Sequence, residues 1–470
     1  MTTSHGSRVP DACSRRQFLR LSSGACAALT LVPAHVIRGE AQPSRKITLA
    51  GVGVGGVGHG QLQECAKAGF QIVALCDVDA TYARKSFDLW PQARRYKDFR
   101  EMLASEGDKI DGVYCGTPDH THALITVAAL RRKKHVCCVK PLTRTIRELR
   151  AVVEEAQRAG VATQVTASPN TTEPGCRTTE IIDAGVLGPV RELHVWSNRP
   201  VWPQGMTRPP GEDPIPKDLD WKLWLGPAPI RPFKNVWHDG DYALTQMNLK
   251  DWDPGVKGVY HPFNFRGWWD FGTGALGDMG CHHFNTPFRA LRLGAPAHVQ
   301  ASATKVLSET APLASIVTLE FPARGSFPSL QATWYDGGLK PPQPVELSGQ
   351  PWPSEGTLYI GEHGLLLSTW EGIKVAPDAA AKRSEGVART LPRREGTWKE
   401  WFLACQGGEP AGCNFSWAGP LTEAVLLGNA AIRAGKRLEW DSTRLQFTNA
   451  GDADRLLGEP YQNGWTLERM

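Results

Sequence analysis

Short apolar runs alternate with amphipathic stretches through the first third of the chain. Five runs have the length and apolar character of buried strands, at residues 46–52, 71–76, 112–115, 135–139 and 161–165. Stretches with helical spacing separate them, near residues 59–68, up to about residue 131 and at 146–159. Strands that alternate with helices predict an α/β fold with a parallel, doubly wound sheet, whose ligands lie at the carboxyl ends of the strands.

The second half of the chain has a different pattern. Apolar or alternating stretches at 191–198, 298–306, 315–321 and 330–334 have strand character. Pro- and Gly-rich turns separate them with few helical segments between, which predicts an open, mostly antiparallel sheet. A helix is expected at 421–435 and a surface loop at 340–353. We therefore predict three parts, at residues 1–40, 41–168 and 169–470.

The first 40 residues carry a separate signal. The pair Arg15-Arg16 is followed by Phe18 and then by an apolar, small-residue stretch at 21–36. This pattern resembles a twin-arginine signal peptide. An amphipathic first helix is the alternative, but the stretch has almost no polar face, and Pro33 and Gly39 end it. The signal predicts export to the periplasm as a folded protein, a route often taken with a cofactor already bound.

Composition and charge exclude several classes of protein. The 470 residues are 41% hydrophobic and 21% charged, as in a globular protein with a sizeable core. The formal net charge is +5, of which the first 40 residues contribute +3 with five Arg against two acids, so +2 remains for the rest. A nucleic-acid partner is therefore not expected. No apolar run after residue 40 approaches the ~20 residues of a membrane span. The eleven Cys show no zinc-ribbon spacing, and Cys137 and Cys138 should leave a strand on opposite faces.

A glycine-rich turn follows the first predicted strand. Residues 53–58 read Gly-Val-Gly-Gly-Val-Gly, so Gly53, Gly55 and Gly58 fit a G-x-G-x-x-G motif, and Gly56 adds a fourth glycine. The three motif glycines permit a tight turn, close approach of a pyrophosphate and close packing of the next helix. A register starting at Gly51 would shorten the strand. A glycine-rich turn without a ligand is the plain alternative.

An acidic residue ends the second predicted strand. Asp77 stands 19 residues after Gly58. A carboxylate at that strand end holds a ribose 2′-OH and repels a 2′-phosphate, so the sequence favours NAD over NADP. A helix N-cap or a turn residue is the alternative role for Asp77. Thr117, Pro118 and Lys140 follow the next two strands, and these groups should therefore meet at one edge of the sheet.

Several motifs together resemble the Gfo/Idh/MocA oxidoreductases. They are the glycine-rich turn, the segments 117–122 (Thr-Pro-Asp-His-Thr-His), 140–141 (Lys-Pro) and 268–282, and the segment 418–423. The resemblance covers most of residues 46–470 and is typical of the exported bacterial branch. It implies a Rossmann domain for NAD and a C-terminal α/β domain with the substrate site and often oligomer contacts. It assigns cofactor binding to the glycine-rich turn, Asp77, Thr117, Pro118, His120, His122 and Lys140.

The same resemblance assigns catalysis to Lys140, Asp278 and His282. Hydride transfer from an alcohol needs a base for the hydroxyl proton and positive charge near the developing alkoxide. Lys140 can supply the charge, and His282, which follows a predicted glycine-rich turn at 277–280, can take the proton. Asp278 precedes His282 by four residues and can orient it from the same helical face. A surface lysine and a core histidine are the alternative interpretations.

Two departures from the family pattern bear on the substrate. Val139 stands where the family usually has Glu, and losing that carboxylate can lower the pKa of Lys140. Residues 166–170 read Thr-Ala-Ser-Pro-Asn in place of a Gly-Asn-Gln stretch with a nearby His, and a polar and aromatic stretch is added at about 235–258. These changes lie at the expected substrate mouth.

Tryptophan is concentrated in the second domain. Sixteen of the 17 Trp follow residue 190, and eight lie between Trp196 and Trp269. Indole faces stack on sugar C–H faces, although Trp more often fills a core or a subunit interface.

Several functions stay open from the sequence. The first is an NAD-dependent oxidoreductase, a homo-oligomer acting on a sugar, cyclitol or polyol hydroxyl. The alternatives are a glycoside hydrolase that oxidises its substrate transiently and a non-catalytic NAD- or sugar-binding protein. A zinc hydrolase using His120, His122, His282 and His283 is a weaker fourth, since no zinc spacing is present.

Overall fold

The computed structural model describes Met1 and residues 46–238, 240–246 and 258–470. The predicted signal peptide and residues 247–257 of the added polar and aromatic stretch lie outside this range. Residues 46–470 form one unit, built around two sheets. Within the described residues no helix is long and apolar enough to cross a membrane.

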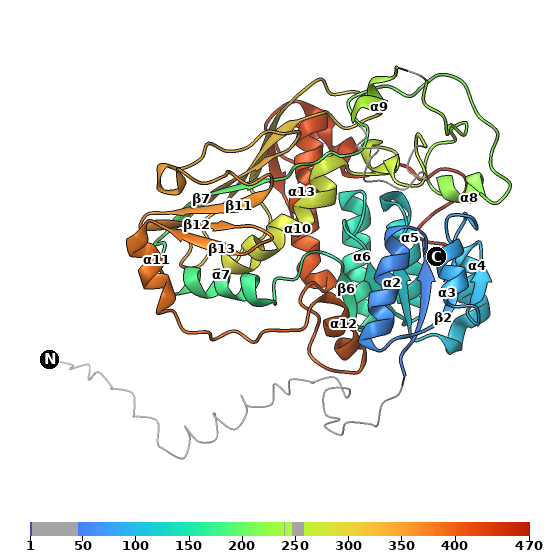
Figure 1. Cartoon of the computed structure of the whole chain (residues 1–470), viewed down its shortest axis with the longest axis horizontal. Helices are drawn as coiled ribbons and strands as arrows, with labels where there is room; N and C mark the ends of the chain where they lie inside the picture. The colour runs from blue at the N-terminus through green and yellow to red at the C-terminus, as the bar shows by residue number, and fades with distance from the viewer. Residues whose placement is uncertain (2–45, 239, 247–257) are drawn as a thin grey trace, which may run out of the picture. The chain divides into compact units, whose positions relative to one another are not determined.

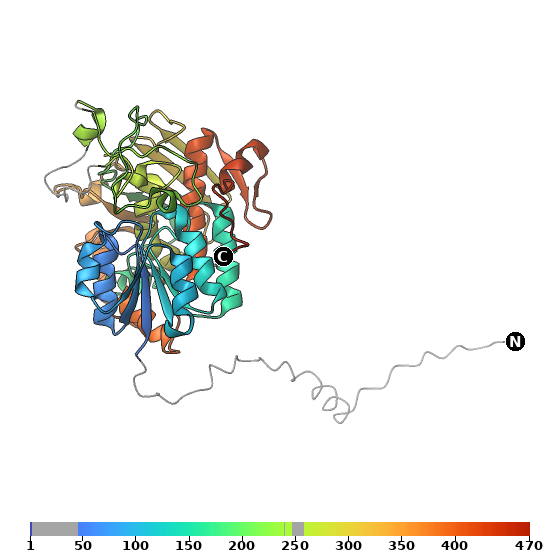
Figure 2. The same ribbon diagram turned by 90° about the vertical axis from the view of Figure 1, so that its right-hand side faces the viewer.

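The first sheet has six parallel strands in the order β3-β2-β1-β4-β5-β6. Its strands are β1 (Thr48–Val52), β2 (Gln71–Cys76), β3 (Arg94–Tyr96), β4 (Gly112–Cys115), β5 (His135–Cys138) and β6 (Thr163–Val165). Its helices are α2 (Val57–Ala68), α3 (Arg84–Leu89), α4 (Phe99–Glu106), α5 (His122–Arg131) and α6 (Ile146–Ala159). They cover both faces of the sheet (Figure 2). The doubly wound α/β prediction is confirmed, and the strand order reverses between β1 and β4, where such sheets bind ligands.

Side chains on the two faces of this sheet enter separate cores. Cys137 packs in the core that includes Trp401, while Cys138 packs in the core with Phe415, as the alternation along a strand predicts. Nine described Cys are buried, and none of them is in a disulfide.

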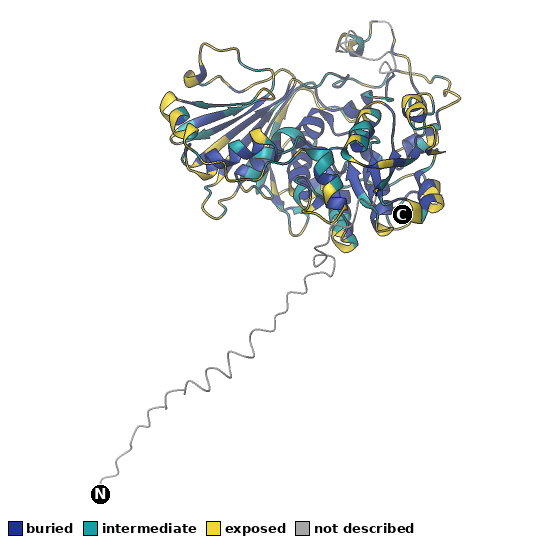
Figure 3. Cartoon of the chain, turned by 60° about the horizontal axis from the view of Figure 1, so that its bottom comes forward, coloured by how far each residue is buried: buried dark blue, intermediate teal, exposed yellow. Residues whose placement is uncertain are grey.

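The second sheet has nine strands in the order β13-β12-β11-β7-β10-β9-β8-β14-β15. They are β7 (Val190–Trp196), β8 (His298–Ala303), β9 (Ser315–Phe321), β10 (Leu330–Tyr335), β11 (Gly356–Gly361), β12 (Gly364–Ser368), β13 (Ile373–Ala376), β14 (Leu438–Asp441) and β15 (Gln446–Phe447). Only the β7–β10 pair is parallel among the described pairs, so the sheet is mostly antiparallel, as predicted. The inner parts of both sheets are buried, and exposure is greatest on the outer helix faces and loops (Figure 3).

Three long helices pack with this sheet around the largest apolar core (Figure 1). They are α7 (Glu173–Asp183), α10 (Gly274–Ala290) and α13 (Phe415–Ala434). The shorter helices are α8 (Trp221–Leu225), α9 (Tyr242–Gln246), α11 (Asp378–Glu385) and α12 (Thr397–Cys405). The glycines predicted as a turn at 277–280 lie inside α10. The helix uses them for close packing, because a Cβ on Gly280 would lie 3.0 Å from both Leu276 and Val425 side chains.

Two segments after residue 169 return to the first domain. Trp401 of α12 packs against Phe70 with ring centroids 4.5 Å apart, and Trp465 stacks on Phe99 at 5.9 Å. The first domain is therefore completed by residues that the chain supplies about 230 positions or more after β6. The predicted boundary at residue 168 marks where the chain leaves the first domain, but the core of that domain also contains residues from after this boundary.

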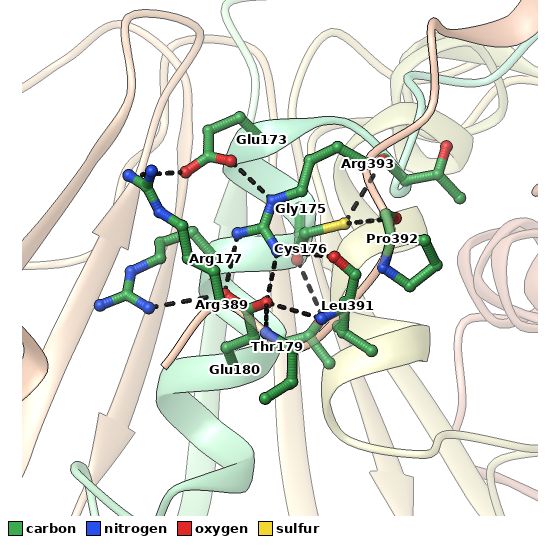
Figure 4. Close-up of polar contacts among 12 residues, drawn as sticks. Glu173, Gly175, Cys176, Arg177, Thr179, Glu180, Arg389, Leu391, Pro392 and Arg393 are labelled. Atoms are coloured by element: carbon green, nitrogen blue, oxygen red, sulfur yellow. Dashed lines mark hydrogen bonds and ion pairs between the residues drawn. The ribbon is translucent and has the colours of Figure 1, made fainter. Parts of the chain in front are cut away.

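An ion-pair network fixes the segment that leads into α12. The Arg393 guanidinium lies between the carboxylates of Glu173 and Glu180, both on α7 (Figure 4). Glu180 is buried and also accepts from the backbone N–H groups of Thr390 and Leu391 at 2.8 and 2.9 Å. The Arg393 hydrogen bond and these N–H groups lower the pKa of Glu180 to about 2, against the effect of burial. The network anchors the chain on α7 just before it crosses to the first domain.

Candidate functional site

A cleft of about 310 Å³ opens at the carboxyl ends of β1, β2, β4 and β5. The first domain supplies Gly53, Gly55, Asp77, Thr117, Pro118 and Lys140 to its lining. The second domain supplies a region near His261 and Arg266, and His282 of α10. The sequence-based expectation that groups at these strand ends meet at one edge is therefore met by the geometry.

The glycine-rich turn forms the start of α2 and has no room for side chains. Gly53 has a φ of 73°, and a Cβ there would lie 2.7 Å from the backbone of Gly116. A Cβ on Gly58 would lie 2.0 Å from the Gly53 carbonyl oxygen, so this glycine lets the helix approach the turn. Gly56 is the N-cap of α2 and provides no side-chain cap. The cradle fits the pyrophosphate of a dinucleotide, which binds at such an uncapped helix start.

Asp77 lies at the end of β2 and holds the turn in place. One carboxylate oxygen accepts from the N–H groups of Val54 and Gly55 at 2.8 and 3.2 Å, and the other accepts from Asp79 N–H at 2.9 Å. Burial raises the pKa of Asp77, and these backbone donors oppose the shift. A carboxylate has about four acceptor positions, so Asp77 can still accept from a ribose hydroxyl.

Tyr82 covers the glycine-rich turn, a contact that the sequence did not reveal. A Cβ on Gly55 would lie 2.2 Å from the Tyr82 ring, and one on Gly56 would lie 1.9 Å from its hydroxyl oxygen. The ring packs edge-on against His261 with centroids 5.2 Å apart, and His261 Nε2 lies 2.9 Å from Asp79 Oδ2. The middle glycines therefore make room for an aromatic ring as well as for a phosphate.

Thr117 and Pro118 line the cleft, whereas the two histidines of the same motif do not. His122 lies between the carbonyl oxygens of Thr117 and Pro141, 2.8 Å from each, and so links the ends of β4 and β5. His120 is fully buried, with Nε2 3.0 Å from the Trp224 carbonyl oxygen. Burial lowers the pKa of His120 to about 3. Both histidines thus contact backbone carbonyl oxygens next to the cleft, and direct contact with the cofactor stays a prediction.

Lys140 and Arg266, which both line the cleft, share one carboxylate. Lys140 Nζ pairs with Asp278 Oδ1, and Arg266 Nη1 lies 2.9 Å from the same oxygen. Burial would raise the pKa of Asp278, but the two cations hold it well below its usual range. Burial lowers the pKa of Lys140, and Arg266 adds to this effect while Asp278 opposes it. Arg266, two residues before the 268–282 motif, had no sequence signal of its own.

Val139 lines the cleft beside Lys140, where the family usually has Glu. The carboxylate that pairs with Lys140 in this structure is that of Asp278, which reaches it from α10. The expected lowering of the Lys140 pKa is present, although burial rather than a lost counter-ion is its main cause.

His282 has a fixed tautomer. Ser168 donates its backbone N–H to His282 Nδ1 at 2.9 Å, and the Ser168 hydroxyl lies at the same distance from this nitrogen. Nδ1 must therefore be unprotonated, and the neutral ring carries its proton on Nε2. Burial lowers the pKa of His282 well below 6.5, and the Lys140 charge lowers it further. In this state the protonated Nε2 can donate a hydrogen bond, whereas the sequence-based prediction gives His282 the role of proton acceptor.

Among the described residues, one group of side chains lies close enough to hold a metal ion. It consists of Cys115, His122 and Cys138, whose ligand atoms lie within 4.8 Å of one another. The four histidines considered for a zinc hydrolase do not form such a group there. Both ring nitrogens of His122 already face carbonyl oxygens, so this cluster is better described as part of the core under the cleft.

Comparison with known proteins agrees with this geometry. Residues 45–167 match the family model GFO_IDH_MocA, described as an oxidoreductase family with an NAD-binding Rossmann fold. Inositol 2-dehydrogenase of Salmonella paratyphi B is 31% identical over 112 residues, which are 23% of this chain and 33% of that enzyme. A 1-carboxy-3-chloro-3,4-dihydroxycyclohexa-1,5-diene dehydrogenase of Comamonas testosteroni is 36% identical over 124 residues, 26% of this chain and 31% of that enzyme. The matches thus span about a third of the length of these curated relatives.

Solved structures resemble the chain over most of its length. The WlbA dehydrogenase from Bordetella pertussis, in complex with NADH and UDP-GlcNAcA, has a TM-score of 0.55 at 16% identity and covers 84% of this chain and 99% of its own. A levoglucosan dehydrogenase in complex with NADH and levoglucosan has a TM-score of 0.54 at 15% identity, with 84% and 99% covered. These likenesses show the two-domain fold. Residues 45–167 form a Rossmann domain that matches the NAD-binding domain of this oxidoreductase family.

Proposed function

We propose that the protein is an NAD-dependent oxidoreductase that acts on a CH–OH group of a sugar, cyclitol or related polyol. The observation that carries the proposal is the meeting of Lys140, Arg266 and His282 with the glycine-rich turn in one cleft. A cofactor site alone would not require a partly buried lysine from the first domain paired with a carboxylate and an arginine from the second domain. The relatives named for activity on inositol and on levoglucosan support the substrate class.

NAD, when bound, accepts a hydride from the carbon that bears the hydroxyl. The residues of this chain must then bind the hydroxyl oxygen and take its proton. Lys140 suits the proton transfer, because burial lowers its pKa toward the working range of an enzyme. His282 suits the second contact, because its Nε2–H can donate to the oxygen as negative charge develops there.

Asp278 and Arg266 position Lys140. Asp278 binds both cations from α10 and does not itself line the cleft. Its strongly lowered pKa makes it a poor proton acceptor, so it serves as a fixed negative charge. Arg266 lines the cleft and adds positive charge near the developing alkoxide.

Export through the twin-arginine route, with the periplasm as its destination, completes the proposal. It is supported by Arg15-Arg16 and the apolar stretch that follows them. Assembly into a homo-oligomer is a further prediction, which the family resemblance supports.

The function is tested by the small molecules that the protein retains. Purified protein is denatured, and the released compounds are identified by mass spectrometry. NAD or NADH in near-stoichiometric amount is the expected result. If the protein releases no dinucleotide and binds neither NAD nor NADH when titrated, the proposal is wrong.

A further inference from the structure

An exposed tryptophan lies close to α10, the helix that carries His282. Trp370 lies in the turn between β12 and β13, and its side chain is 53% exposed. Among the tryptophans that the structure describes, it is the only exposed one. Its ring centroid lies 6.4 Å from that of His282 and 5.2 Å from that of His283. Among the described tryptophans, Trp370 is therefore the candidate for stacking on a sugar ring.

A partly buried carboxylate lies beside this tryptophan. Glu355, just before β11 and with its side chain 12% exposed, accepts a hydrogen bond from His283 Nε2 at 3.2 Å. Ser197 Oγ also donates to it, at 3.4 Å. The contact between the His283 and Trp370 rings restricts the Trp370 side chain, so less side-chain freedom is lost when a ligand stacks on the indole.

Arg199 offsets the charge of Glu355. Arg199 Nη1 lies 3.9 Å from Glu355 Oε1, and the arginine side chain is 27% exposed. His283 and Arg199 are among the groups that lower the pKa of Glu355 against the effect of burial, so Glu355 carries its negative charge. Glu371, the exposed neighbour of Trp370 along the chain, adds a second carboxylate close to Glu355. The cluster therefore has hydrogen-bonding groups for hydroxyls and no net positive charge to attract a carboxylate.

We propose that Trp370, with Glu355 and Arg199, forms a subsite for the uncharged ring of a sugar or cyclitol. The C–H face of the ring stacks on the indole, and its hydroxyls bond to Arg199 and Glu355. This assignment rests on the proposed function. The His282 ring contacts Trp370 and also lines the cleft that contains Lys140, so the subsite adjoins the site of the proposed reaction. A ring seated on Trp370 presents one edge to His282, and a hydroxyl on that edge is the one oxidised.

Ligand binding and turnover are measured separately to test the subsite. Saturation-transfer NMR on the NADH-loaded protein uses myo-inositol, levoglucosan and D-glucuronate as probes. The variants are Trp370→Ala, Trp370→Phe and Glu355→Gln, and Tyr242→Ala serves as a control for loss of an exposed aromatic side chain elsewhere. NADH affinity and melting temperature are recorded for each variant, so that a misfolded protein is recognised. Trp370→Phe keeps an aromatic ring, and it is used to test the subsite if the alanine variant fails to fold.

At least one neutral ring should bind, with saturation transferred to its C–H protons. Trp370→Ala should weaken that binding about tenfold, Trp370→Phe should weaken it less, and Tyr242→Ala should leave it unchanged. In turnover with NAD, Trp370→Ala should raise KM by a similar factor with little change in kcat. D-Glucuronate should bind no more tightly than the neutral rings.

Two results would contradict the subsite but not the proposed function. The first is an unchanged KM in Trp370→Ala for a probe that still reduces NAD. The second is tighter binding of D-glucuronate than of either neutral ring. Absence of binding by both neutral rings also overturns the subsite. The opposite result, binding that depends on Trp370 without reduction of NAD by any bound probe, would support the subsite and count against the oxidoreductase.

Discussion

The backbone N–H of Ser168 donates to Nδ1 of His282 at 2.9 Å, which places the imidazole proton on Nε2. This one contact connects the end of the first domain to α10 and makes His282 a hydrogen-bond donor toward the cleft. The sequence-based prediction gave the positive charge to Lys140 and proton acceptance to His282. The proposed function exchanges these roles: it assigns proton transfer to Lys140 and stabilisation of the oxygen to His282.

The His282 ring should therefore stay neutral across the physiological range. Burial and the Lys140 charge lower its pKa well below 6.5, so its ¹⁵N imidazole resonances should not titrate between about pH 6 and pH 8. Ser168→Ala keeps the backbone donor and should preserve the tautomer. His282→Ala should slow hydride transfer by about 10² to 10³, the cost of losing one donor to a developing oxyanion. A titration midpoint near 6.5 would contradict the fixed tautomer.

Asp77 should set the preference for NAD over NADP. Asp77→Asn removes the charge that repels a 2′-phosphate and keeps an amide oxygen for the N–H groups of Val54 and Gly55. The variant should bind NAD about tenfold more weakly and lose most of its discrimination against NADP. Isothermal titration with both cofactors measures the two affinities. Equal affinities in the unchanged protein would show that Asp77 does not select the cofactor.

Glu180 should make the protein sensitive to acid. Its folded-state pKa of about 2 lies below the usual value for Glu, so its stabilisation is present above that usual value and is lost as the pH falls toward 2. Glu180→Gln should lower the free energy of unfolding by about 2 kcal/mol at neutral pH and flatten the acid limb.

Glu173→Gln is the matched control, because Glu173 bonds the same arginine from an exposed position. It should change the stability far less, as exposed ion pairs do. Urea unfolding between pH 2 and pH 7 distinguishes the two variants. Equal losses of unfolding free energy in both variants would mean that the buried ion pair of Glu180 stabilises the protein no more than the exposed ion pair of Glu173.

Export should depend on the arginine pair. Replacing Arg15 and Arg16 by Lys should leave the full-length precursor in the cytoplasm while residues 46–470 still fold. Cell fractionation with an antibody to the protein locates it. Normal periplasmic delivery of the Lys-Lys variant would rule out the twin-arginine route.

Strands that are marked by a clear apolar run in the sequence were predictable. Residues 71–76, 112–115 and 315–321 were assigned as strands with the bounds that the structure has, because apolar runs between turns mark them clearly. Of the two edge strands of the first sheet, β6 was predicted and β3 was not. β3 carries Arg94 and Arg95 on exposed positions, so its sequence lacks the apolar signal of a buried strand.

The site residues divide in the same way. Gly53, Thr117 and Lys140 follow strands along the chain, so the topology of a parallel sheet places them together. Arg266, Tyr82 and Trp370 reach the site through contacts between distant segments, for which one sequence has no periodic signal. His120 does not line the cleft, because a motif position does not show on which side of the motif the pocket lies.

Hydride transfer in a single turnover tests the central claim most directly. Protein loaded with NAD is mixed with myo-inositol or levoglucosan, and the absorbance of reduced nicotinamide is followed over a range of pH. The rate should rise with pH as Lys140 loses its proton, with a midpoint below 10.5 because burial lowers its pKa. Lys140→Met should lower the rate by about 10² to 10³ and remove this rise, with NAD affinity little changed. An unchanged rate and pH profile in Lys140→Met would contradict the account.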